Sequence, residues 1–241
     1  MSDPALRPVR VDFAPIRAVC IDLDGTLLDT IPDLAAAANR MLVDVGLVPL
    51  DAAQVGRFVG KGAEVLIARS LAAAGRPEAA GSPFYALARD RFFDNYRALN
   101  GLASVVYEGV SEGLASLRGQ GLALACVTNK PVEFVGPLFE RFDLARHFDF
   151  TIGGDSLPVR KPHPGPFLEA CRRWSLAPSQ VLAVGDSAND ALAARAAGLP
   201  VLLVPYGYNE GEPVASVDAD GIVSSLSELA RLVQGRHVRP S

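Results

Sequence analysis

The stretch Ala18-Val-Cys-Ile-Asp-Leu-Asp-Gly-Thr26 combines a short apolar run with two aspartates and a Gly-Thr pair. An apolar run that ends at a turn signal is typical of a strand buried inside a sheet. Such a strand gains nothing from a carboxylate in its last residues, because burying a charge is costly. Asp22 and Asp24 therefore indicate a functional site at the end of this strand.

Further apolar runs of the same kind follow along the chain. They span residues 122–128, 148–152, 181–185 and 201–204. Helical patterns lie between them, at residues 110–118, 132–142, 165–174 and 188–197. Strands that alternate with helices imply right-handed crossovers and a parallel sheet covered on both faces. We therefore expect an α/β fold.

The segment from residue 30 to residue 101 interrupts this alternation. It is rich in alanine, contains no convincing strand, and predicts four helices at 31–45, 51–59, 63–74 and 83–99. Asp51 and the pair Ser82-Pro83 are typical of helix starts. We expect a helical domain at residues 30–101, inserted into a discontinuous α/β domain made of residues 1–29 and 102–241.

Composition excludes several classes of protein. The chain has 241 residues, 27 of them acidic and 23 basic, and a net charge of −4. A nucleic-acid partner is not expected, because it would need a broad basic surface. A membrane partner is not expected either, since the apolar runs fall far short of the roughly 20 residues of a membrane span. Monomer and homodimer both remain open.

The expected location is the cytoplasm. The first twelve residues mix proline, arginine and aspartate and lack the apolar core of a secretion signal. The three cysteines stand far apart, and their odd number argues against a disulfide framework.

Polar residues also follow two other expected strands. Thr128 and Asn129 end the second strand, and Asp186 and Asp190 follow the strand that ends at Gly185. Ligands of open parallel sheets bind beyond the carboxyl ends of the strands. Carboxylates gathered there would repel one another without a cation, and an all-oxygen site suits Mg²⁺. Taken alone, either aspartate after Gly185 could be a helix cap.

Four short segments together resemble the motifs of the haloacid dehalogenase-like phosphohydrolases, and they occur in the same order. They are Asp22-Leu-Asp-Gly-Thr-Leu-Leu-Asp-Thr30, Val127-Thr-Asn129, Lys161-Pro-His-Pro-Gly-Pro166 and Gly185-Asp-Ser-Ala-Asn-Asp190. A joint match is far more specific than any single short motif. The resemblance covers nearly the whole chain and implies a Rossmann-like parallel sheet core with an inserted α-helical cap.

The resemblance implies roles for the motif residues. Asp22 would be the nucleophile that forms a phosphoaspartyl intermediate, and Asp24 the general acid and base. Thr128, Asn129 and Lys161 would hold the phosphoryl oxygens. The residues implied to bind Mg²⁺ are Asp22, Asp24 through its main-chain carbonyl, Asp186 and, in a supporting position, Asp190. An acid at position 24 favours phosphate ester hydrolysis over dehalogenation, because a halide leaves without a proton.

Two segments resemble phosphoglycolate phosphatases in particular. They are Arg57-Phe-Val-Gly-Lys-Gly-Ala63, in the inserted helices, and Tyr206-Gly-Tyr-Asn-Glu-Gly-Glu-Pro213, after the last strand. Arg57 and Lys61 are candidate substrate ligands, and Gly60-Lys61-Gly62 could offer N–H groups and a cation to a substrate carboxylate. It could equally be a glycine-rich turn with a solvated lysine. The expected activity is Mg²⁺-dependent hydrolysis of 2-phosphoglycolate, a small phosphorylated metabolite.

Three alternatives stay open. The same mechanism could serve another small phosphomonoester, such as a sugar phosphate, or pyrophosphate. A β-phosphoglucomutase-like enzyme would share all four motifs and a helical cap. A non-catalytic sensor of a phosphorylated metabolite is disfavoured, because it could tolerate loss of Asp22 or Asp24 and both are present.

Overall fold

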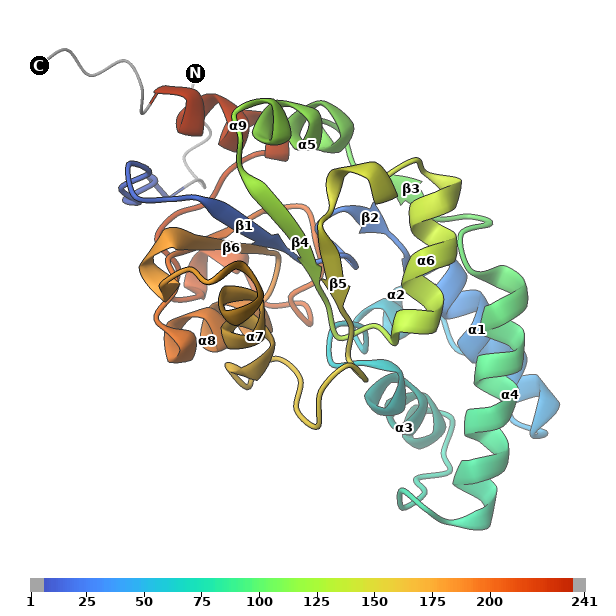
Figure 1. The fold of residues 1–241 in the computed structure, drawn as a ribbon. Helices are drawn as coiled ribbons and strands as arrows, with labels where there is room; N and C mark the ends of the chain where they lie inside the picture. Colours follow the sequence, from blue (N-terminus) through green and yellow to red (C-terminus); the bar gives the residue numbers. More distant parts are fainter. Residues whose placement is uncertain (1–6, 236–241) are drawn as a thin grey trace, which may run out of the picture.

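A five-stranded parallel sheet forms the centre of the protein in the computed structural model, which describes residues 7–235 (Figure 1). The strands are β1 (Ala18–Ile21), β4 (Ala123–Val127), β5 (Phe150–Ile152), β6 (Val181–Gly185) and β7 (Val201–Leu203). Their order across the sheet is β5-β4-β1-β6-β7, and every neighbouring pair is parallel. The residues that follow β1 therefore lie between those that follow β4 and β6. The expected α/β fold is confirmed.

Helices cover both faces of the sheet. They are α5 (Val110–Gly119), α6 (Val132–Arg141) and α9 (Leu226–Gln234) on one face, and α7 (Gly165–Trp174) and α8 (Ala188–Ala197) on the other. Val19 and Ile21 of β1 pack against the first group, whereas Ala18 and Cys20 pack against the second. A central strand that is buried on both faces has to be apolar throughout, which explains the run of residues that begins at Ala18.

Four helices form a separate layer at the lower right of Figure 1. They are α1 (Ile31–Asp44), α2 (Ala52–Gly56), α3 (Ala63–Ala73) and α4 (Pro83–Leu99), and we call them the helical block. The block has an apolar core of its own, which includes Met41, Leu71 and Phe92. Phe134, at the start of α6, joins this core and connects the block to the sheet layer.

Two helices of the block begin at the caps that the sequence predicts. The Asp51 carboxylate accepts hydrogen bonds from the N–H groups of Ala53 and Gln54, at 2.9 and 3.3 Å. The Ser82 hydroxyl accepts one from the N–H of Tyr85, at 3.0 Å. These bonds satisfy N–H groups that the first turn of a helix leaves unpaired. No helix between residues 7 and 235 is long and apolar enough to cross a membrane.

The structure differs from the sequence-based expectation at several places. Helix α2 ends at Gly56, three residues before the expected end at residue 59. Strand β1 ends at Ile21, because the carbonyl of Leu23 closes a turn by accepting bonds from the next residues, including Leu27 at 2.9 Å. Two strands of two residues each, β2 (Leu28–Asp29) and β3 (Val105–Val106), pair antiparallel and flank the helical block. They are too short to show a periodic pattern. Helix α9 was not predicted either.

A buried carboxylate ties the start of the helical block to the segment that leaves it. Asp33, in the first turn of α1, is 1% exposed. Its oxygens accept hydrogen bonds from the N–H groups of Gly101, Ala103 and Ser104, at 2.9, 2.8 and 2.9 Å, and from the Ser104 hydroxyl at 2.5 Å. Four donors compensate for the cost of burying the charge.

We expect Asp33→Ala to lower the free energy of unfolding by about 2 to 4 kcal/mol, because it leaves buried N–H groups without partners. Urea denaturation followed by circular dichroism measures this loss. Asp94→Ala is the matched control, since Asp94 is exposed and pairs only with Arg97 on the surface of α4. Equal stability of the two variants would show that the Asp33 bonds contribute little.

Candidate active site

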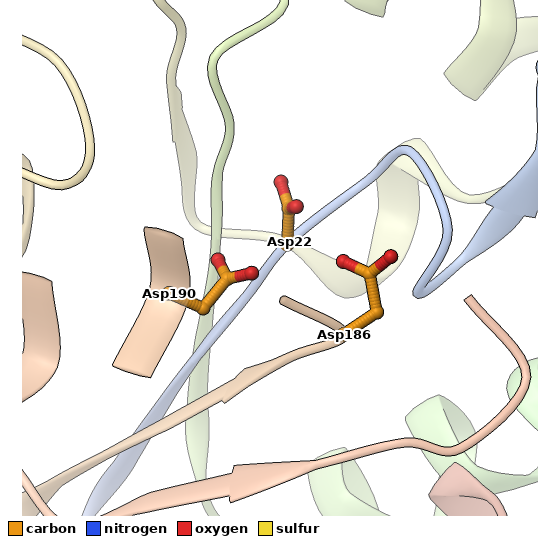
Figure 2. Close-up of side chains that lie close together, drawn as sticks. All are labelled: Asp22, Asp186 and Asp190. Carbon is orange, nitrogen blue, oxygen red and sulfur yellow. The ribbon is translucent and has the colours of Figure 1, made fainter. Parts of the chain in front are cut away.

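Three carboxylates lie together at the carboxyl edge of the sheet (Figure 2). Asp22 follows β1, Asp186 follows β6, and Asp190 belongs to the first turn of α8. Each offers one oxygen, and these three oxygens all lie within 4.8 Å of one another. The parallel pairing of β1 with β6 produces this convergence, because their ends meet at the same edge.

A buried lysine pairs with two of these carboxylates. The Lys161 Nζ atom lies 2.6 Å from Asp190 Oδ1 and 3.0 Å from Asp22 Oδ1, and it donates to the Val127 carbonyl at 2.7 Å. The lysine side chain is only 2% exposed. Burial alone would lower the pKa of Lys161, but the two carboxylates outweigh it and raise the pKa above its ordinary value. Lys161 therefore remains a cation.

A second buried lysine, Lys130, pairs with Asp24. Its Nζ atom lies 2.8 and 3.0 Å from the two carboxylate oxygens of Asp24. The Thr30 hydroxyl donates to the same carboxylate at 2.7 Å. Lys130 was not predicted as a site residue from the sequence, where the candidates ended at Asn129. Its position directly after the motif Val127-Thr-Asn129 is the feature that could have indicated it.

Thr128 and Asn129 lie at the end of β4, beside these pairs. The Thr128 hydroxyl oxygen accepts from the Lys130 N–H at 3.2 Å. The Asn129 amide donates to the carbonyls of Gly60, at 3.1 Å, and of Lys161, at 2.9 Å. Asn129 thus connects the sheet edge to the helical block and to the segment that carries Lys161.

The Asp186 carboxylate is held between two glycines. A side chain at Gly25 or at Gly207 would collide with it, and Gly25 also has a φ of +85°, which favours glycine. The Tyr208 main-chain N–H donates to Asp186 Oδ2. The Tyr208 hydroxyl oxygen donates to Asp29 Oδ1 at 2.6 Å and accepts from the Thr30 N–H at 2.7 Å, so this residue also contacts the entrance to the helical block.

A narrow cavity of about 30 Å³ lies between the sheet edge and the helical block. Its polar side, which we call the floor, is lined by Asp22, Asp24, Thr128, Asn129 and Lys130. Its opposite side, which we call the roof, is lined by Leu34, Val59, Leu66, Phe92, Tyr96 and Phe134. A volume of this size holds about two water molecules. The cavity therefore suits a small ligand with one polar end.

Arg57 and Lys61 are not brought into this cavity. The Lys61 Nζ atom lies 2.7 Å from the Glu210 carboxylate, which also binds Arg69 at 2.6 Å. Arg57 is exposed and lines a separate hollow beside Gly211. The Lys61 side chain therefore meets a carboxylate of the protein itself, whereas Gly60 and Gly62 on either side of it line the cavity.

The acidic cluster carries excess negative charge. Burial, together with the charges of Asp190 and Asp24, raises the pKa of Asp22 to about 7, against the opposing effect of Lys161. Burial and the charges of Asp190 and Asp22 likewise raise the pKa of Asp186 well above its usual range. The Lys161 ammonium group, at 3.0 Å, is the only polar partner of Asp22 Oδ1 among the described residues. An atom of this kind fits a cation ligand.

Buried carboxylates and lysines beneath a cavity at the carboxyl edge of a parallel sheet define an enzyme active site. A sequence model of the haloacid dehalogenase-like hydrolases matches residues 16–198. The chain belongs to this family, which confirms the resemblance carried by its four motifs.

Individual relatives are similar over nearly their whole length. Phosphoglycolate phosphatases of Nitrosospira multiformis and Thiobacillus denitrificans are 48% and 44% identical to this chain, over 91% of it and 96% of each relative. A crystal structure described as a predicted phosphoglycolate phosphatase from Haemophilus somnus has a TM-score of 0.87 at 35% identity. It covers 92% of this chain and 100% of its own.

We expect the stability of the metal-free protein to fall as the pH rises from about 4 to about 7, to the extent that Asp22 contributes. Its pKa is about 7 when folded and 3.8 in its unperturbed state, so the folded protein binds more protons across this window. Asp22→Asn removes this contribution. Its stability relative to the wild type should therefore increase with pH in urea denaturation with EDTA.

Asp94→Asn is the control, because Asp94 is exposed on α4 and lies away from the cluster. If the difference between Asp22→Asn and the wild type is the same at every pH, the pKa of Asp22 is not raised in the folded protein.

Proposed function

We propose that this chain is a Mg²⁺-dependent phosphatase that hydrolyses 2-phosphoglycolate to glycolate and phosphate. The observation that carries the substrate is the 48% identity, over nearly full length, to a phosphatase of that name. The observation that supports the reaction is the floor of the cavity, where Asp22 and Asp24 lie beside two lysines.

We also propose a division of labour within the chain. Residues 1–29 and 102–241 would form the catalytic core, and residues 30–101 a cap over the site. The separate apolar core of the helical block and the position of the cavity between block and sheet support this division. The ends of the proposed core, residues 1–6 and 236–241, lie outside the described residues.

The acidic cluster fits Mg²⁺. The available donors are carboxylate oxygens, which a hard cation prefers, and the buried Asp22 Oδ1 has Lys161 as its only polar partner among the described residues. Asp22, Asp186 and the main-chain carbonyl of Asp24 would hold the ion. Asp190 would support the site, because its oxygens already accept bonds from Lys161 and Ser187. When bound, the ion supplies positive charge that offsets carboxylate repulsion and polarises the phosphoryl group.

The proposed reaction has two steps. The Asp22 carboxylate attacks phosphorus, the bond to the ester oxygen breaks, and Asp24 donates its proton to the departing glycolate oxygen. Asp24 then takes a proton from a water molecule, which attacks phosphorus and releases phosphate from Asp22. Both roles need side chains that reach the cavity, and both aspartates line its floor.

Other residues would hold the transferring phosphoryl group. Lys161 is fixed by Asp190 and the Val127 carbonyl, so its ammonium group lies next to Asp22 without further ordering. The Thr128 hydroxyl and the N–H groups near Asn129 would donate to the remaining oxygens. Phosphoryl transfer depends chiefly on such alignment and on positive charge around the equatorial oxygens.

The shape of the cavity favours a small substrate. A volume of about 30 Å³ requires some widening even for 2-phosphoglycolate, and considerably more for a hexose phosphate. The side chains of the roof are also largely apolar, so the hydroxyl groups of a sugar would lose water and gain few side-chain partners there. Both properties support the smaller ester over a sugar phosphate.

A substrate panel tests the proposed activity. We expect kcat/KM for 2-phosphoglycolate to exceed that for glucose 6-phosphate, β-glucose 1-phosphate and pyrophosphate by at least about tenfold, the equivalent of 1.4 kcal/mol. EDTA should abolish the activity and Mg²⁺ should restore it. Comparable rates on all substrates would contradict the substrate assignment. Isomerisation of the hexose 1-phosphate without phosphate release would indicate a mutase.

Two variants test the proposed roles. Asp22→Asn should lower kcat at least about a thousandfold, because the amide is a poor nucleophile. Asp24→Asn should lower it by about 10² to 10⁴, the usual contribution of a general acid and base. Asp51→Asn is the control, since asparagine also caps a helix. Retained activity in Asp22→Asn, with mass spectrometry excluding deamidation to aspartate, would exclude Asp22 as the nucleophile.

A further inference from the structure

A single positively charged side chain among the described residues lines the cavity beneath the helical block. Lys130 is the only lysine, arginine or histidine among the described residues that line it. Its side chain is 2% exposed, and its Nζ atom contacts both carboxylate oxygens of Asp24. The proposed reaction does not use this ammonium group, because Lys161, which lies beside Asp22, serves the phosphoryl group.

A buried hydroxyl faces the same cavity. Tyr96, in α4, is 2% exposed, and the Lys130 ammonium group is the only polar partner of its hydroxyl among the described residues. Its ring centroid lies 5.0 Å from the Lys130 Nζ atom. An ammonium group can only donate, so the Tyr96 O–H proton has no acceptor among the described residues, and a hydroxyl of this kind that lines a cavity points to a ligand with an acceptor.

We propose that Lys130 and the Tyr96 hydroxyl bind the carboxylate of the substrate's leaving group and thereby determine specificity. This inference rests on the proposed phosphatase activity and adds the residues that recognise the substrate. The ligand chemistry is a phosphate ester with a carboxylate one methylene away from the ester oxygen.

The position of Lys130 relative to Asp24 supports this assignment. The general acid must lie within about 2.6 to 3.2 Å of the ester oxygen that it protonates. In 2-phosphoglycolate, a carboxylate oxygen lies roughly 3 Å from that ester oxygen, as bond lengths near 1.5 Å dictate. An ammonium group 2.8 Å from Asp24 can therefore bind the substrate carboxylate when the ester is oriented with that carboxylate toward Lys130.

The rest of the roof makes this recognition selective. Leu34, Val59 and Phe92 present only apolar atoms to the cavity. A carboxylate that meets an ammonium group in such surroundings forms a strong, charge-assisted hydrogen bond. A substrate without the carboxylate would leave the hydroxyl of Tyr96 unpaired and the charge of Lys130 shared with Asp24 alone, so it would bind less well.

Lys130 could instead serve only to position Asp24, and the choice of substrate separates the two roles. Ethyl phosphate has a methyl group where 2-phosphoglycolate has its carboxylate. A positioning role predicts that Lys130→Met lowers kcat/KM for both esters by the same factor. A carboxylate-binding role predicts an additional loss of about 100-fold for 2-phosphoglycolate alone, mostly in KM.

Tyr96→Phe provides a second, milder test. We expect kcat/KM for 2-phosphoglycolate to fall about 3- to 10-fold, with little change for ethyl phosphate. The melting temperature should change little, because Lys130 keeps its ion pair with Asp24 when the Tyr96 hydroxyl is removed. The matched control is Tyr85→Phe in the same helix, since the Tyr85 hydroxyl donates to Glu64 and Tyr85 does not line the cavity.

The outcomes are distinguishable. If the wild type hydrolyses esters but does not prefer 2-phosphoglycolate over ethyl phosphate, both the proposed substrate and the carboxylate site are wrong. If the wild type has that preference and neither variant reduces it, only the assignment to Lys130 and Tyr96 is wrong. If Lys130→Met does not fold or is inactive on both esters, the result with Tyr96→Phe decides.

Discussion

The site depends on one electrostatic constraint. Its buried carboxylates repel one another, and two buried lysines offset that repulsion. Lys161 neutralises charge between Asp22 and Asp190, and Lys130 does so at Asp24. Removing either lysine would leave an uncompensated charge in a poorly solvated place. With Asp186 included, the site has four carboxylates and two lysines. When all are ionised, the excess is two negative charges, which one divalent cation would neutralise. The net charge of the whole chain says nothing about this local balance.

Local patterns predicted most of the fold. Strands such as 181–185 and helices such as 165–174 were predicted with their observed bounds, because continuous apolar runs and capping residues are properties of adjacent residues. The antiparallel pair of β2 with β3 could not be predicted, since each strand has two residues and its partner lies beyond the helical block.

Prediction of the site was limited by contacts between distant parts of the chain. The motif resemblance located the aspartates after β1 and β6, but Lys130 reaches Asp24 across 106 residues of sequence. Lys61 was predicted either to face a substrate carboxylate or to be solvated in a glycine-rich turn, and in the structure its partner is Glu210, 149 residues away. Composition and spacing contain no information about which of two acidic groups a lysine will meet. The roof residue Tyr96 could not be predicted either, because only the packing of α4 places it above the sheet edge.

Tyr208 connects two parts of the protein that the sequence keeps apart. Its main chain holds Asp186, while its hydroxyl group holds Asp29 and the N–H of Thr30, where the chain enters the helical block. The β2–β3 pair and the Asp33 carboxylate tie the entry of the block to its exit. A motion of the block that displaces Asp29 or Thr30 would therefore disturb the residue whose main chain holds Asp186.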